Sequence, residues 1–112
     1  MIFQCSIKKA NWKKEKAILV EAGLMTDWQD NEWIRYNPEG FYYMGYKPRL
    51  TLENGFTNKQ NLILTARQFT SIVMLHKLNP SLTTEDLIKT LKLNQRNKWA
   101  LKYSPKYKHL IN

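Results

Sequence analysis

The chain has 112 residues, of which 43% are hydrophobic and 12% aromatic, and its formal net charge is +9. This length supports one domain with a single core, and the apolar and aromatic content excludes a disordered chain. No stretch approaches the roughly 20 consecutive apolar residues of a membrane-spanning helix, so the sequence predicts no membrane partner.

The N-terminal residues predict a core strand in a cytoplasmic protein. Phe3, Cys5 and Ile7 share one face of a half-buried strand over residues 2–7. Cys5 is the single cysteine, so it can form no internal disulfide and fits a reducing compartment. Residues 1–9 also lack the charged-then-apolar order of a secretory signal. We expect Cys5 to be a small buried side chain and not a reactive thiol.

A helix is predicted from residue 12 to about residue 22, with Asn11 as its N-cap and Gly23 as a left-handed stop. The expected buried stripe consists of Ala17, Val20 and Leu24, with Ile18 and Leu19 beside it. Lys13 and Lys14 lie in the first turn, where free backbone N–H groups favour anions. They are therefore candidate phosphate ligands, although a solvated run of charges explains them as well.

Aromatic strands follow in the middle of the chain. Residues 32–36 and 41–46 predict a hairpin joined by a turn over residues 37–40. A third strand is expected over residues 49–53, with residues 56–64 returning along it after an Asn-Gly turn. Together these segments predict an antiparallel meander of three or four strands.

The second hairpin strand carries Phe41, Tyr43 and Tyr46 beside Gly40. In these positions it resembles the base-stacking strand of the RNA-recognition motif, which implies contact between these rings and RNA bases. Ile2 and Phe3 on the first predicted strand add to this resemblance. The pattern departs from that family at Glu39, where a basic residue is expected, and at Tyr42, where a small one is. Packing on both faces of a buried strand explains the aromatic residues equally well.

Three helices are predicted in the last third of the chain, over residues 66–78, 84–93 and 95–103. Thr65 with Gln68, and Thr83 with Asp86, have the spacing of capping boxes at the first two starts. The predicted fold is therefore α+β: one compact domain over residues 1–112, in which a strand–helix–meander half (1–64) precedes a helical basic half (65–112).

No enzyme chemistry is evident from residue spacing. Neither His76 nor His109 pairs with a cysteine or carboxylate at the spacing of a metal site or nucleophile. We predict no catalytic residue, metal or cofactor. The alternative is a metal-dependent nuclease in which Asp27, Asp30 and Glu32 hold Mg²⁺.

The basic half carries the candidate functional residues. Residues 1–60 have nine Lys/Arg and seven Asp/Glu, whereas residues 61–112 have nine and two. The expected phosphate ligands there are Lys89, Lys92, Arg96, Lys98, Lys102, Lys106 and Lys108. Gln95, Arg96 and Asn97 are the candidates for reading base edges, at the start of the second helix of a helix-turn-helix. Tyr103 and Tyr107 are the candidates for stacking, while Trp99 is expected to anchor the core.

These patterns predict a small basic protein that binds nucleic acid, DNA or RNA, in a regulatory role. The alternative is an inhibitor or adaptor, of the kind encoded by phages and mobile elements, that binds an acidic surface of a host protein. The same lysines would serve both functions, and composition does not separate them.

Overall fold

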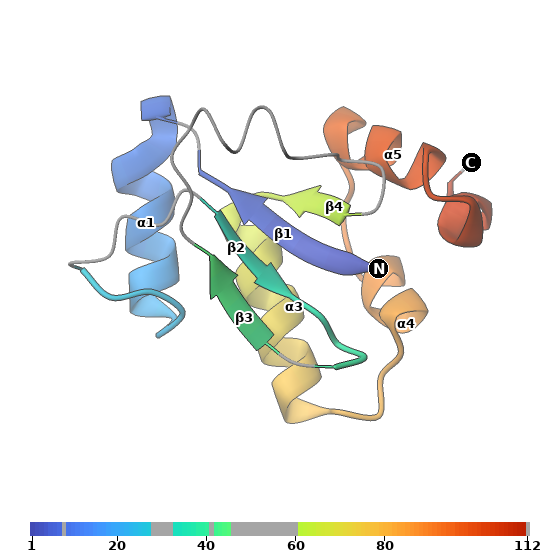
Figure 1. Cartoon of the computed structure of the whole chain (residues 1–112), viewed down its shortest axis with the longest axis horizontal. Coiled ribbons are helices and arrows are strands. Elements are labelled where there is room, and N and C mark those ends of the chain that lie inside the picture. Colours follow the sequence, from blue (N-terminus) through green and yellow to red (C-terminus); the bar gives the residue numbers. More distant parts are fainter. Residues whose placement is uncertain (8, 28–32, 41, 46–60, 112) are drawn as a thin grey trace.

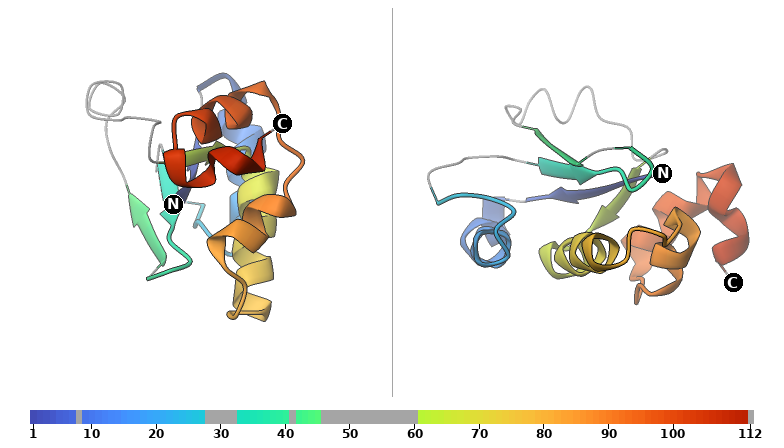
Figure 2. Two further views of the ribbon diagram at one scale, coloured as in Figure 1. Left: turned by 90° about the vertical axis from the view of Figure 1, so that its right-hand side faces the viewer. Right: turned by 90° about the horizontal axis from the view of Figure 1, so that it is seen from below.

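The computed structural model describes residues 1–7, 9–27, 33–40, 42–45 and 61–111 and has both a sheet and helices, which confirms the predicted α+β class. The strands are β1 (Ile2–Ser6), β2 (Trp33–Tyr36), β3 (Tyr42–Gly45) and β4 (Asn61–Leu64). The α-helices are α1 (Trp12–Glu21), α3 (Ala66–Leu78), α4 (Thr84–Lys89) and α5 (Gln95–Lys102), with 3₁₀ turns η1 (Lys9–Asn11) and η2 (Pro105–Leu110). The helices lie against one face of the sheet (Figures 1 and 2). None of the described helices is long and apolar enough to cross a membrane.

The strands form one sheet in the order β3-β2-β1-β4. β2 and β3 pair antiparallel, as the predicted hairpin requires, and Gly40 N donates to Asn37 O within the predicted turn. β4, however, pairs in parallel with β1, so the expectation of a purely antiparallel meander is wrong. The expected strand over residues 49–53 and its Asn-Gly turn lie outside the described residues.

The burial of β4 gives the physical reason for this pairing. All four of its residues are buried, so both faces and both edges of the strand need cover. β1 pairs with one edge, and α5 packs on β4, where Asn97 Nδ2 donates to Ile63 O.

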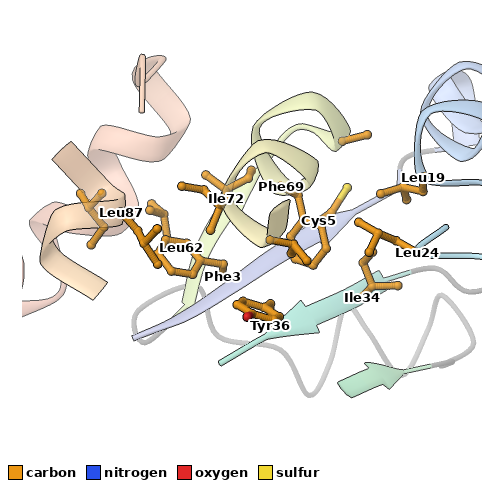
Figure 3. Close-up of a cluster of buried hydrophobic side chains, with 14 of the residues drawn as sticks. Phe3, Cys5, Leu19, Leu24, Ile34, Tyr36, Leu62, Phe69, Ile72 and Leu87 are labelled. Carbon is orange, nitrogen blue, oxygen red and sulfur yellow. The ribbon is translucent and has the colours of Figure 1, made fainter. Parts of the chain in front are cut away.

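The core lies between the sheet and the helices. Phe3 pairs in register with Tyr36 on one side and Leu62 on the other, and Cys5 pairs with Ile34 and Leu64, so six side chains share one face. Figure 3 shows this row packed against α3 and against the end of α1. The helix residues in this core include Leu19, Phe69, Ile72 and Leu87, and Leu24 joins them from just after α1.

The predicted first helix is confirmed within one residue, and Gly23 adopts the expected left-handed conformation at φ +77°. Its buried side differs from the prediction, because Leu19 is buried while Ala17 is exposed and Val20 only half-buried. Asn11 stands at the N-cap position without a side-chain capping bond. The orientation of α1 follows from its packing on α3, which its own weak apolar pattern does not specify.

Both predicted capping boxes are present. Thr65 and Gln68 bond reciprocally at the start of α3, and Thr83 and Asp86 do so at the start of α4. The hydrogen bonds from Thr83 lower the pKa of the Asp86 carboxyl. α4 ends at Lys89, four residues before the predicted end, because the backbone closes there with Thr90 N donating to Leu87 O and Leu91 N to Ile88 O.

Cys5 is fully buried, and burial raises the pKa of its thiol to about 12. Because the thiolate is the reactive form, its population falls about a thousandfold relative to the ordinary pKa of 9.0. We therefore expect a disulfide reagent to label Cys5 about 1,000-fold more slowly, or slower still, in the native protein than in urea, as the thiolate fraction implies. Stoichiometric labelling of native protein within minutes at pH 8 would contradict the buried position.

Candidate nucleic-acid interface

Helix α5 has one buried side and one exposed side. Asn94 and Asn97 form a capping box at its start. Asn97, Ala100 and Leu101 are buried, and the helix packs on β4 and η2. These residues are three and four apart, so they occupy one face of the helix and leave the opposite face to solvent.

The exposed side of α5 lines a groove of about 510 Å³. The residues that line it, here called the basic groove, are Gln95, Lys98, Trp99, Lys102, Lys108 and Ile111. Three of these are lysines and none is a carboxylate. Lys98 and Lys102 lie one helical turn apart, and η2 places Lys108 near them, so cations from two elements surround one hollow.

An aromatic pair stands on the same side of the helix. The rings of Trp99 and Tyr103 stack with centroids 5.5 Å apart and planes at 26°, and Lys102 Nζ lies 5.0 Å from the Trp99 centroid. The side chains are 45% and 51% exposed, respectively. The prediction that Trp99 anchors the core is therefore wrong. Trp99 precedes the buried Leu101 by two residues, which places it about 200° around the helix and away from the core. This spacing indicates an exposed position, although the size of the indole favours burial.

Two of the predicted nucleic-acid contacts are buried, and these predictions are wrong. Asn97 is 1% exposed, its side-chain Nδ2 donates a hydrogen bond to Ile63 O, and its Oδ1 accepts one from Asn94 N. Its buried amide therefore cannot reach a base edge. Tyr107 is 4% exposed and belongs to the core, where its hydroxyl accepts a bond of 3.4 Å from the N-terminal amine of Met1. Its ring therefore cannot stack on a base.

The predicted phosphate ligands divide into separate groups. Lys98, Lys102 and Lys108 line the basic groove. Arg96, Lys92 and Lys106 are exposed on or beside α5 and η2, and Lys89 pairs with Glu85 at 3.6 Å on α4. Lys13 and Lys14 are exposed on α1, which lies at the opposite end of the molecule from α5 (Figure 1). The lysines of α1 and α5 thus belong to different surfaces.

The predicted helix-turn-helix does not match the packing. Such a motif needs its two helices to pack on each other so that one supports the other in the major groove. Among the described elements, α4 packs on α3 and η2, whereas α5 packs on β4 and η2. The interpretation of α4 and α5 as a helix-turn-helix is therefore wrong. Of the predicted base-reading residues, Gln95 and Arg96 remain exposed at the start of α5.

The resemblance to the RNA-recognition motif is also limited by the topology. β2 separates β3 from β1, so Phe3 and the aromatic residues of β3 are not on neighbouring strands. Phe3 is moreover fully buried on the helix-covered face. A stacking surface that combines the two strands is therefore not formed.

Each histidine has a polar partner. His76 Nδ1 and the Tyr36 hydroxyl are hydrogen-bonded, with rings in edge contact at 5.5 Å, and burial raises the pKa of Tyr36. This arrangement agrees with the half-buried, satisfied imidazole that the apolar stripe of α3 implies. His109 Nε2 bonds to Glu85 Oε1 at 3.0 Å, a partner that sequence spacing did not indicate, and this bond lowers the pKa of Glu85.

The carboxylates proposed for a nuclease are only partly described. Asp27 is exposed after α1, and Asp30 and Glu32 lie outside the described residues. Within the described ranges, no three His, Cys, Asp or Glu side chains gather closely enough to hold a metal ion.

The basic groove combines cations that can neutralise phosphates with aromatic faces that can stack on bases. In this groove the two chemistries surround one hollow. Comparison of this chain with models of protein families, with curated proteins and with solved structures finds no match.

Proposed function

We propose that this protein binds nucleic acid through the basic groove of α5 and η2, in a regulatory role without catalysis of its own. The observation that supports the proposal is the position of Lys98, Lys102 and Lys108 around the exposed Trp99, in a hollow whose described lining residues include no Asp or Glu. A solvated charge run would not need an exposed indole among its cations. An anion with flat apolar faces fits both features.

Phosphate neutralisation makes the binding salt-dependent. Each phosphate contact contributes a slope of about −0.9 to log K against log salt on duplex DNA, and about −0.7 on a single strand. If the three groove lysines each contact one phosphate, the slope is therefore about −2.7 or about −2.1. Fluorescence anisotropy of labelled oligonucleotides at several salt concentrations measures it.

Two double variants, in which lysines are neutralised and no charge is reversed, test the location of the binding site. Lys98→Gln with Lys102→Gln removes two contacts, which should weaken binding at ~0.1 M salt about 25-fold for a single strand and about 60-fold for a duplex. The matched control is Lys13→Gln with Lys14→Gln, which removes the same charge from α1. We expect the control to change the dissociation constant by less than about threefold, because α1 and α5 lie at opposite ends of a molecule whose longest extent is 38 Å (Figure 1). Salt screens charges that are separated by more than a Debye length of ~8–10 Å.

Equal losses in the two double variants would show that net charge, and not the groove, drives binding. Absence of binding to any duplex, single strand or RNA at low salt would overturn the proposal. In that case, retention of one acidic protein from nuclease-treated host lysate, lost in the groove variant only, would favour the inhibitor or adaptor function.

A further inference from the structure

We propose that the basic groove selects single-stranded over double-stranded nucleic acid, with one unstacked base lying against the Trp99–Tyr103 pair. The inference rests on the proposed function and specifies its ligand. It follows from the exposure of the two rings, the size of the groove and the burial of Asn97, one of the three predicted base-reading residues.

The aromatic pair is held ready for a planar ligand. Trp99 and Tyr103 stack on each other at 5.5 Å on the solvent side of α5. The opposite side of the helix is fixed in the core by Ala100 and Leu101. Two rings about half exposed leave apolar surface in water, and a base that covers it removes this cost. Because the rings are preorganised, little side-chain entropy is lost on stacking.

A double helix cannot use these rings. In a duplex each base is covered on both faces by its neighbours, so an aromatic side chain can stack only on a base that has left the stack. Base edges in a duplex are instead read by hydrogen-bonding side chains. Of the three predicted base-reading residues, Asn97 is buried, and Gln95 lines the basic groove together with Trp99.

The dimensions and charges of the groove fit one nucleotide and its flanking phosphates. Its volume of about 510 Å³ lies within the ~300–1,000 Å³ of small-ligand sites. Lys98, Lys102 and Lys108 surround it, so phosphates on either side of the stacked base meet a cation. A second hollow of about 320 Å³ shares Lys98 and Ile111 with the groove and is otherwise lined by leucines, which gives a neighbouring base an apolar surface.

The test compares a short single strand, the duplex of the same sequence and an abasic strand of the same length. DNA and RNA versions of the single strand show whether the 2′-hydroxyl matters. We expect Trp99→Ala to weaken binding of the single strand between about 5- and 150-fold, the loss of one base–aromatic stack. Its salt slope should stay unchanged, because no phosphate contact is removed.

Matched variants separate stacking from a change in folding. Trp99→Phe keeps an aromatic face and should recover affinity to within about threefold, whereas Trp99→Leu keeps apolar bulk without it and should not. The duplex and the abasic strand should bind more weakly than the single strand, and Trp99→Ala should change their dissociation constants by less than about twofold.

The outcomes distinguish this inference from the function on which it rests. If the abasic strand or the duplex binds as tightly as the single strand, or if Trp99→Leu binds as well as Trp99→Phe, the selection by stacking is overturned while nucleic-acid binding stands. If none of the ligands binds, both proposals fail. A single strand that binds best, with a loss confined to the non-aromatic variants, supports both.

Discussion

Leu101→Ala is expected to lower the free energy of unfolding by about 2–5 kcal/mol, because it empties a fully buried position in the helix that carries the basic groove. Leu101 belongs to the same core cluster as Leu62 and Leu64 of β4, so its loss loosens α5 from the sheet. Domains of this kind are stable by about 5–15 kcal/mol in total, so the change is a large fraction. Urea denaturation followed by circular dichroism measures it.

The control for this prediction is Trp99→Ala, two residues away on the exposed side of α5. Although tryptophan is larger than leucine, the free energy of unfolding should fall less than for Leu101→Ala, because about half of the indole already lies in solvent. Its stacking on Tyr103 contributes about 0.5–1.5 kcal/mol beyond its partial burial. If Trp99→Ala destabilised the fold more than Leu101→Ala, the indole would be a core anchor, and the proposed platform for bases would not exist.

Asn97→Ala is expected to lower the free energy of unfolding by about 1.5–5 kcal/mol. The amide of Asn97 has two roles: Oδ1 accepts from Asn94 N at 3.3 Å in the capping box, and Nδ2 donates to Ile63 O on β4. Loss of a capping interaction costs about 0.5–2 kcal/mol. A buried carbonyl left without its donor costs a further ~1–3 kcal/mol. Thermal or urea denaturation measures the sum.

Two variants separate these roles. Asn94→Ala removes only the capping contribution, so the free energy of unfolding should fall by about 0.5–2 kcal/mol. Asn97→Asp keeps an acceptor for Asn94 N but faces Ile63 O with a carboxylate at a position 1% exposed, so it should destabilise at least as much as alanine. Asn97→Ala protein that is folded should bind oligonucleotides with unchanged affinity. If the variant instead lost sequence preference while its stability stayed unchanged, Asn97 would be a base-reading residue after all.

The correct sequence predictions depend on chemistry within a few residues. Thr65 with Gln68, and Thr83 with Asp86, start helices because each pair satisfies free backbone N–H groups three residues away. Gly23 ends α1 because a residue without Cβ adopts positive φ at little cost. The β2–β3 hairpin follows from the turn chemistry of residues 37–40. Such interactions close locally, so the sequence determines them without the rest of the fold.

The candidate site was only partly predictable, because its residues are brought together by contacts between distant parts of the chain. The sequence located the cations in residues 89–108 but did not determine which of them share a surface. It expected Trp99 inside and left Tyr107 available to bases, whereas the structure has them reversed. Size and apolarity favour burial of either ring, and their positions on α5 and η2 decide which ring faces the core.

The sequence by itself therefore determined the α+β class, the helix starts and the basic character of the C-terminal half. Tertiary structure alone decided the parallel pairing of β4 with β1, the burial of Asn97 and Tyr107, and the gathering of three lysines around an exposed indole. The partners in these cases are distant in the chain: Asn97 bonds to a strand 34 residues earlier, and Tyr107 to the N-terminus 106 residues away. Which side of a helix is buried depends on the surface that it meets, and that surface is formed only when the chain folds.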